Sequence, residues 1–271
     1  MSSKHATTLT TATLLLYIIS ISTVVLTAHM SGYEWVLATM TKENGLFESL
    51  TVVLLFVLSF LSFRYSLGQT PFFKISLALF GLVAFIAAME EISWGQQLLH
   101  FESSEFFRQN NLQQETNLHN LVKGGLFSSF IYSCVYTVFV FAPVILRIIA
   151  LKSSFVSKFA NFLPPFHVSL IALFASSFQV YFYDNFSAVF DLLTFLTGLA
   201  VFGIGVSILK AWDKTLAIHY LIILASTALF MSSYKIFGFF NSQYEIREMF
   251  VVLATTLYLI SLFDKTRYLK N

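Results

Sequence analysis

Two pairs of ionisable residues in this 271-residue chain have the spacing that places side chains on one face of a helix. Glu115 and His119 are four residues apart, and Glu245 and Glu248 are three apart. A carboxylate beside an imidazole can exchange a proton with a bound substrate, and both groups are common metal ligands. The sequence therefore suggests acid–base or metal-dependent chemistry, with Glu91, Glu115 and His119 as candidate catalytic residues.

Other carboxylates stand at the ends of long apolar runs. Glu48 is close to the start of one run, and Glu91 closes another. Ionisable groups in membrane spans usually face a protein interior or a water-filled cavity, so we expect these carboxylates to gather in one site. A divalent metal ion is the candidate cofactor. The candidate metal ligands are Glu48, Glu91, Glu115, His119, Glu245 and Glu248.

A second interpretation of the same residues needs no active site. In it the carboxylates are solvated among lipid headgroups, or are paired with Arg108, Lys235 and Arg247. Lys235 either extends toward the interface or pairs with Glu245, Glu248 or Asp191. The polar residues expected around the cluster are Glu90, Trp94, Gln96, Asn117, Asp191 and Lys235.

The composition indicates a membrane protein. Hydrophobic residues make up 57% of the chain and charged residues 11%, whereas about a quarter of the residues of a soluble domain are charged. The mean hydropathy is +0.76. Membrane lipids are therefore the expected partners, and a net charge of only +2 gives no indication of nucleic-acid binding. Cys134 is the single cysteine, which excludes an intrachain disulfide and a zinc–thiolate site.

Apolar runs long enough to cross the hydrocarbon core, which takes about 20 residues, predict the elements that position these groups. We expect one all-α domain over residues 1–271, a polytopic transmembrane bundle of about eight spans. The runs are continuous rather than alternating, which favours helices over barrel strands. The predicted spans are Leu9–Ala28, Leu46–Leu67, Phe73–Met89, Leu126–Ile149, His167–Tyr183, Ala188–Leu209, Ala217–Phe240 and Ile246–Phe263.

The first run could also be read as a secretory signal, but no small-residue cleavage site follows it, so a retained helix is preferred. With eight spans, eleven Lys and Arg residues fall on the side of both termini and five on the other side. Because cytoplasmic loops are enriched in Lys and Arg, we expect both termini to be cytoplasmic.

The only long polar stretch lies between the third and fourth spans, at about residues 92–124. Ser103, Ser104 and Glu105 form a helix-start signal, and apolar residues recur on either side of them. We expect short amphipathic helices on the outer surface of the bundle.

This stretch carries a resemblance. Glu90-Glu91-Ile92-Ser93-Trp94-Gly95-Gln96, followed by Glu115-Thr116-Asn117-Leu118-His119-Asn120, is similar to the signature of an uncharacterised family of bacterial polytopic inner-membrane proteins. The resemblance also includes the stretches Glu43–Glu48 and Tyr244–Glu248. It implies a bacterial inner-membrane location and supplies no activity.

Three functions remain open from the sequence. The first is an integral membrane enzyme that acts on a lipid or lipid-linked substrate. The second is a cation- or proton-coupled transporter or channel, which requires polar groups through the whole thickness of the bundle. The third is a non-catalytic scaffold or sensor whose outer segment binds a partner. The chain has no His-Glu-x-x-His, Gly-x-Ser-x-Gly, phosphate-loop or dinucleotide-binding motif.

Overall fold

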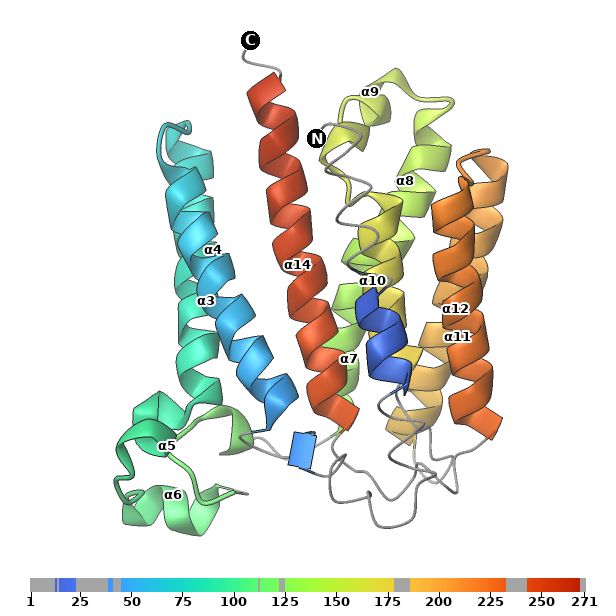
Figure 1. Cartoon of the computed structure of the whole chain (residues 1–271). Helices are drawn as coiled ribbons and strands as arrows, with labels where there is room; N and C mark the ends of the chain where they lie inside the picture. The colour runs from blue at the N-terminus through green and yellow to red at the C-terminus, as the bar shows by residue number, and fades with distance from the viewer. Residues whose placement is uncertain are drawn as a thin grey trace.

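The computed structural model describes residues 13, 15–22, 39–40, 45–111, 113–121, 125–177, 186–232 and 243–268, and these residues form helices and no strand (Figure 1). Six helical stretches among them are long and apolar enough to cross a membrane. This confirms the all-α polytopic bundle. The six are α3 (Leu46–Ser66), α4 (Pro71–Glu91), α7 to α8 (Gly125–Ala150), α11 (Phe186–Ile208), α12 (Lys214–Ser232) and α14 (Gln243–Tyr268).

The third stretch is continuous but not uniform. The helix α7 (Gly125–Tyr136) passes through one π-helical turn, η3 (Thr137–Phe141), into α8 (Ala142–Ala150). Pro143, the second residue after this turn, has no backbone N–H to donate, so the regular hydrogen-bond pattern changes here.

Two of the eight predicted spans are not established. Of Leu9–Ala28, only residues 13 and 15–22 lie within the described part, and they are helical. The fifth predicted span appears as α10 (Phe166–Ser177), a 12-residue helix that is shorter than the hydrocarbon core requires. Residues 178–185 lie outside the described part, so the count of eight stays a prediction.

Local chemistry explains where two helices begin. The helix α4 begins at Pro71, where the missing N–H costs no hydrogen bond because first-turn N–H groups have no helical partner. The helix α12 begins at Lys214 because the Asp213 carboxylate accepts the backbone N–H of Leu216 at 2.7 Å.

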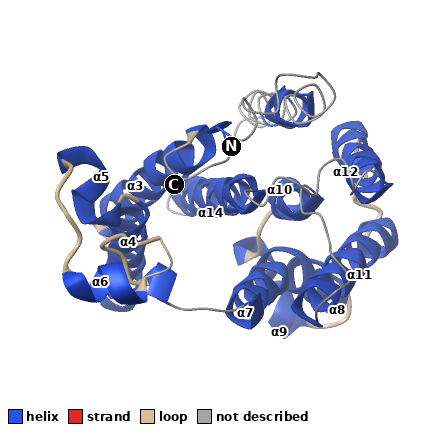
Figure 2. Cartoon of the chain, turned by 90° about the horizontal axis from the view of Figure 1, so that it is seen from below, coloured by secondary structure: helices blue, strands red, loops and turns tan. Residues whose placement is uncertain are grey.

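The short helix α10 is the centre of the bundle. Every residue from Val168 to Ser177 is buried, and α10 packs against α14, α12 and α11. The α3–α4 hairpin lies on the far side of α14, as the end-on view in Figure 2 shows. The outer face of α4 exposes apolar side chains, among them Phe73, Leu79 and Val83, as expected for a helix that faces lipid.

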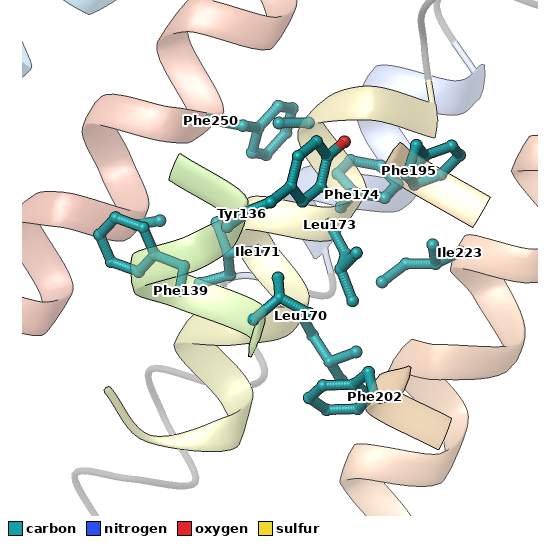
Figure 3. Close-up of a cluster of buried hydrophobic side chains, with 14 of the residues drawn as sticks. Tyr136, Phe139, Leu170, Ile171, Leu173, Phe174, Phe195, Phe202, Ile223 and Phe250 are labelled. Atoms are coloured by element: carbon teal, nitrogen blue, oxygen red, sulfur yellow. The ribbon is translucent and has the colours of Figure 1, made fainter. Parts of the chain in front are cut away.

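Apolar side chains from several helices fill the interior (Figure 3). The Phe174 ring stacks on Tyr17 with the ring centroids 3.7 Å apart and meets the edge of Phe250 at 4.9 Å. Leu170 and Leu173 are fully buried beside them. The middle of the bundle is thus closely packed around α10.

The two ends of the bundle differ in character. The predicted short helices are present as α5 (Gln96–Leu99) and α6 (Glu105–Asn110), which lie where α3 begins and α4 ends; we call this the α6 end (Figure 1). Two 3-10 turns, η1 (Ser93–Gly95) and η2 (His119–Leu121), flank them. The short helices α9 (Ser154–Ser157) and η4 (Ala160–Phe162) mark the opposite α9 end.

Candidate functional site

Three of the predicted carboxylates meet at the α6 end. Glu48 lies in the first turn of α3, Glu91 is the last residue of α4, and Glu248 is near the start of α14. The Glu91 carboxyl group interacts electrostatically with those of Glu248, Glu48 and Glu90, and Glu248 interacts with Glu48. We call Glu48, Glu91 and Glu248 the glutamate cluster.

The glutamate cluster is in a protected setting. The side chain of Glu48 is only 5% exposed, and those of Glu91 and Glu248 are partly buried. Like charges repel more strongly away from water, so a proton or a cation shared among the three carboxyl groups lowers their electrostatic energy. The arrangement is therefore suited to holding and moving a proton.

Glu115 lies in a different set of contacts. Its carboxylate accepts hydrogen bonds from the Ser93 hydroxyl and from the Asn117 side-chain amide, the latter at 3.2 Å. Asn117 also donates to the Ser93 hydroxyl oxygen at 3.0 Å. Ser93 has a positive φ of 48°, an uncommon conformation for a serine, which these bonds help to hold. Glu115 thus links the later part of the polar segment, where it lies with Asn117, to Ser93 just after α4.

The other predicted polar residues of this segment have similar roles. The Glu90 carboxylate accepts the indole N–H of Trp94 and the backbone N–H of Leu118, each at 2.5 Å. The Gln96 side chain accepts the backbone N–H of Thr116 at 2.7 Å. Glu90, Trp94, Gln96 and Asn117 therefore have structural roles in the segment that follows α4.

Asp191 and Arg247 form an ion pair inside the bundle. The Arg247 guanidinium is 3.6 Å from the Asp191 carboxylate, and the two side chains are 1% and 9% exposed. The guanidinium carbon also lies 3.1 Å from the centroid of the Tyr132 ring. Charged groups this deep in a membrane protein are costly unless they are paired. Lys235, the partner considered for Asp191 from the sequence, lies outside the described residues.

The remaining predicted ligands are not placed in the glutamate cluster. His119 belongs to η2, but its side chain lies outside the described part. Glu245 is partly buried on α14, one turn before Glu248. Among the described residues, no three His, Cys, Asp or Glu side chains are positioned to hold a metal ion. The side chain of His119 is not among the described ones, so the metal site stays a prediction.

Sequence reasoning missed the role of Arg247. From the sequence, Arg247 is expected only as a possible partner of carboxylates at the level of the lipid headgroups. The signal was its position inside the last predicted span, since a charge within a span is seldom left facing lipid.

No protein-family model, curated protein sequence or solved structure matches this chain.

Proposed function

We propose that this protein is an integral membrane enzyme that performs acid–base chemistry on a lipid or lipid-linked substrate at the glutamate cluster. The observation that carries the proposal is the position of Glu48, Glu91 and Glu248 at the α6 ends of three separate helices, close enough for their carboxyl groups to interact electrostatically. Three carboxyl groups can hold one proton between them and pass it to a substrate. Glu91 is the proton carrier, because its carboxyl group interacts with three others, those of Glu48, Glu90 and Glu248.

The surroundings of the glutamate cluster support an amphiphilic substrate. Glu91 ends a membrane-crossing helix, which places its carboxyl group at the depth where headgroups meet hydrocarbon. Nearby on α3 and α4, Leu46, Leu50, Phe85 and Ile86 expose apolar side chains to the outside of the bundle. A lipid can therefore keep its chains in the bilayer while its headgroup reaches the carboxyl groups.

A metal-dependent form of this chemistry is part of the proposal. Carboxylates of the glutamate cluster, with His119, would bind a divalent cation that polarises a substrate oxygen. Thermal unfolding in Mg²⁺, Mn²⁺ or Zn²⁺, against a chelator, tests this form. Stabilisation by one cation that is lost in Glu48→Gln supports it. Equal unfolding temperatures in all conditions leave the metal-free form.

The transporter alternative receives less support. It requires polar groups along the whole length of the bundle, whereas the buried side chains in the middle of α10 are mainly apolar, among them Leu170, Leu173 and Phe174 (Figure 3). The scaffold alternative is supported by the hydrogen bonds of Glu90 and Glu115, which shape the polar segment. It does not account for three carboxyl groups gathered away from water.

Lipid analysis of cells that produce the protein tests the enzyme. The variants are Glu91→Gln and the matched control Glu102→Gln, which changes a carboxylate that is 92% exposed in the same segment. We expect wild type and Glu102→Gln to produce a lipid species that Glu91→Gln forms about 100-fold more slowly. Identical lipid profiles for wild type and Glu91→Gln, at equal levels of folded protein, would exclude the enzyme.

The same proposal includes a location. We place the protein in a bacterial inner membrane, with the α6 end outside and both termini in the cytoplasm. The bias of Lys and Arg residues toward one side supports this orientation. The similarity of residues 90–96 and 115–120 to the bacterial signature supports the location.

A further inference from the structure

A second cluster of titratable side chains lies toward the α9 end of the bundle, opposite the glutamate cluster. His167 is at the start of α10, His219 is on the second turn of α12, and Asp213 immediately precedes α12. Tyr17, in the helical segment 15–22, completes the group. These residues are far apart in the sequence, and their proximity is a property of the fold.

The four side chains are arranged in a row from water to the interior. Asp213 is 59% exposed at its side chain, and its carboxylate lies 3.6 Å from Nε2 of His167, which is 38% exposed. The rings of His167 and His219 are perpendicular, with centroids 6.2 Å apart. His219 is 1% exposed, and its ring lies 5.5 Å from that of Tyr17, which is fully buried.

The buried polar atoms of this row have no hydrogen-bond partner among the residues that the structure describes. They are both ring nitrogens of His219, Nδ1 of His167 and the hydroxyl of Tyr17. Buried polar atoms are nearly always hydrogen-bonded, because leaving one without a partner costs about 1–3 kcal/mol. Several such atoms side by side indicate a place that receives something small and polar.

We propose that His167 and His219 form a proton-binding site that exchanges protons with water at the α9 end through Asp213. An imidazole is suited to this task because one ring nitrogen accepts a proton while the other releases one. The Asp213 carboxylate takes a proton from a hydronium ion at the α9 end, so that one O–H bond of the hydronium ion breaks, an O–H bond forms on Asp213 and a water molecule leaves. That proton then passes to Nε2 of His167, and the proton on Nδ1 moves on toward His219.

Other described charged or titratable side chains on the neighbouring elements either donate hydrogen bonds elsewhere or are exposed to solvent. Arg147 donates hydrogen bonds to the carbonyl oxygens of Pro143, Leu163 and Pro164. The hydroxyl of Tyr220 donates to the carbonyl of Leu199, and that of Tyr258 to the carbonyl of Phe162. Lys210 and Lys214 are exposed to solvent. Among the side chains that the structure describes, Asp213 is thus the acidic group that faces the imidazole pair.

A proton fits this site better than a metal ion. No three described His, Cys, Asp or Glu side chains are placed to share one, and the inner neighbours of His219 are the aromatic rings of Tyr17 and His167. The Asp213 carboxylate, 3.6 Å from Nε2 of His167, stabilises the protonated form of the imidazole, whereas burial favours the neutral form. Both forms of the ring are therefore used in the proposed exchange.

Histidine NMR of the full-length protein tests the site. The protein, labelled with ¹⁵N-histidine and held in lipid nanodiscs, is titrated from about pH 4 to about pH 9. His167→Gln and His219→Gln assign the two resonances. We expect both resonances to titrate, and Asp213→Asn to move the His167 midpoint down by about 0.5–1 pH unit. His100→Gln, at the exposed and distant α6 end, is the control that leaves both titrations unchanged.

Asp213→Asn is not expected to cause misfolding, because the side chain is largely exposed and asparagine keeps an oxygen that can accept the backbone N–H of Leu216 at the start of α12. A His219 resonance that stays in one protonation state throughout the range would overturn the proposal, as would a His167 midpoint that Asp213→Asn does not move. Either result would mean that His167 and His219 are packed in the interior and do not exchange protons with water. The proposal does not depend on the glutamate cluster, and it stands or falls without the proposed enzyme.

Discussion

Replacing Arg247 leaves the Asp191 carboxylate buried without the positive charge beside it. Removal of one member of a buried ion pair typically costs about 3–5 kcal/mol, because the remaining charge has no water to solvate it. We therefore expect Arg247→Met to lower the free energy of unfolding by about that amount. Unfolding of the purified protein in detergent, followed by circular dichroism, measures the loss.

Two further variants make this result specific. Combining Arg247→Met with Asp191→Leu removes both charges and should restore most of the stability. Arg108→Met breaks an exposed pair with Glu102, where the expected change is below about 1 kcal/mol. A double variant as unstable as the single one would show that Arg247 acts through its packing on Tyr132 instead.

At the scale of residues, the sequence indicated which polar side chains lie in the bundle better than it indicated which residues they contact. Glu48 and Glu91 could be expected near each other, because one begins and the other ends a membrane-crossing run. The contacts of Glu115 with Ser93 and Asn117 could not be expected from the sequence, because they depend on two uncommon backbone conformations at Ser93 and Trp94. The closeness of His167 and His219 depends on how α10 and α12 pack.

The polar segment between α4 and α7 is held by a few hydrogen bonds, and this predicts how it opens. Glu115→Leu removes the acceptor of the Ser93 hydroxyl and the Asn117 amide. We expect the backbone amide of Thr116 to exchange its hydrogen about 10-fold faster, which corresponds to the loss of roughly 1.4 kcal/mol. Hydrogen–deuterium exchange with mass spectrometry measures the change.

Glu105→Leu is the matched control, because its carboxylate contacts only the exposed side chain of Gln109 in the same helix. It should leave the exchange of Thr116 unchanged. Equal exchange in wild type and Glu115→Leu would mean that other contacts hold the segment closed.

Neighbouring helices approach two glycines of α11 to different distances. A Cβ atom at Gly205 would lie 2.0 Å from Val144 of α8, whereas one at Gly198 meets nothing nearer than 3.4 Å. Small residues allow membrane helices to pack closely. We expect Gly205→Ala to lower the unfolding temperature by several degrees and Gly198→Ala to change it little. Thermal unfolding monitored by fluorescence compares them, and equal effects would argue against close packing at Gly205.

At the scale of elements, most helices could be predicted, because 20 apolar residues have few alternatives in a membrane. The position of α10 in the middle of the bundle could not be predicted from the sequence. Its sequence reads as a span, but the described helix has 12 residues and is buried on all sides. Hydropathy does not distinguish a side chain that faces lipid from one that faces other helices.

The orientation of the whole molecule can be tested with single cysteines. In a Cys134→Ala background, Ser104→Cys places an exposed thiol at the α6 end and Ser157→Cys places one at the α9 end. A membrane-impermeant thiol reagent added to intact cells should modify only the first, and permeabilised cells should show both. Modification of only Ser157→Cys in intact cells would reverse the proposed orientation.

The hairpin of α3 and α4 has one further consequence. It packs on the rest of the described bundle mainly through the contact of α3 with α14, and α4 is exposed over most of its length. Glu48 and Glu91 move with the hairpin, whereas Glu248 is fixed to α14. A thicker or thinner bilayer changes the tilt of a lipid-facing hairpin. We therefore expect the spacing of these acidic groups to change with the thickness of the bilayer, and lipids of different chain length would test this.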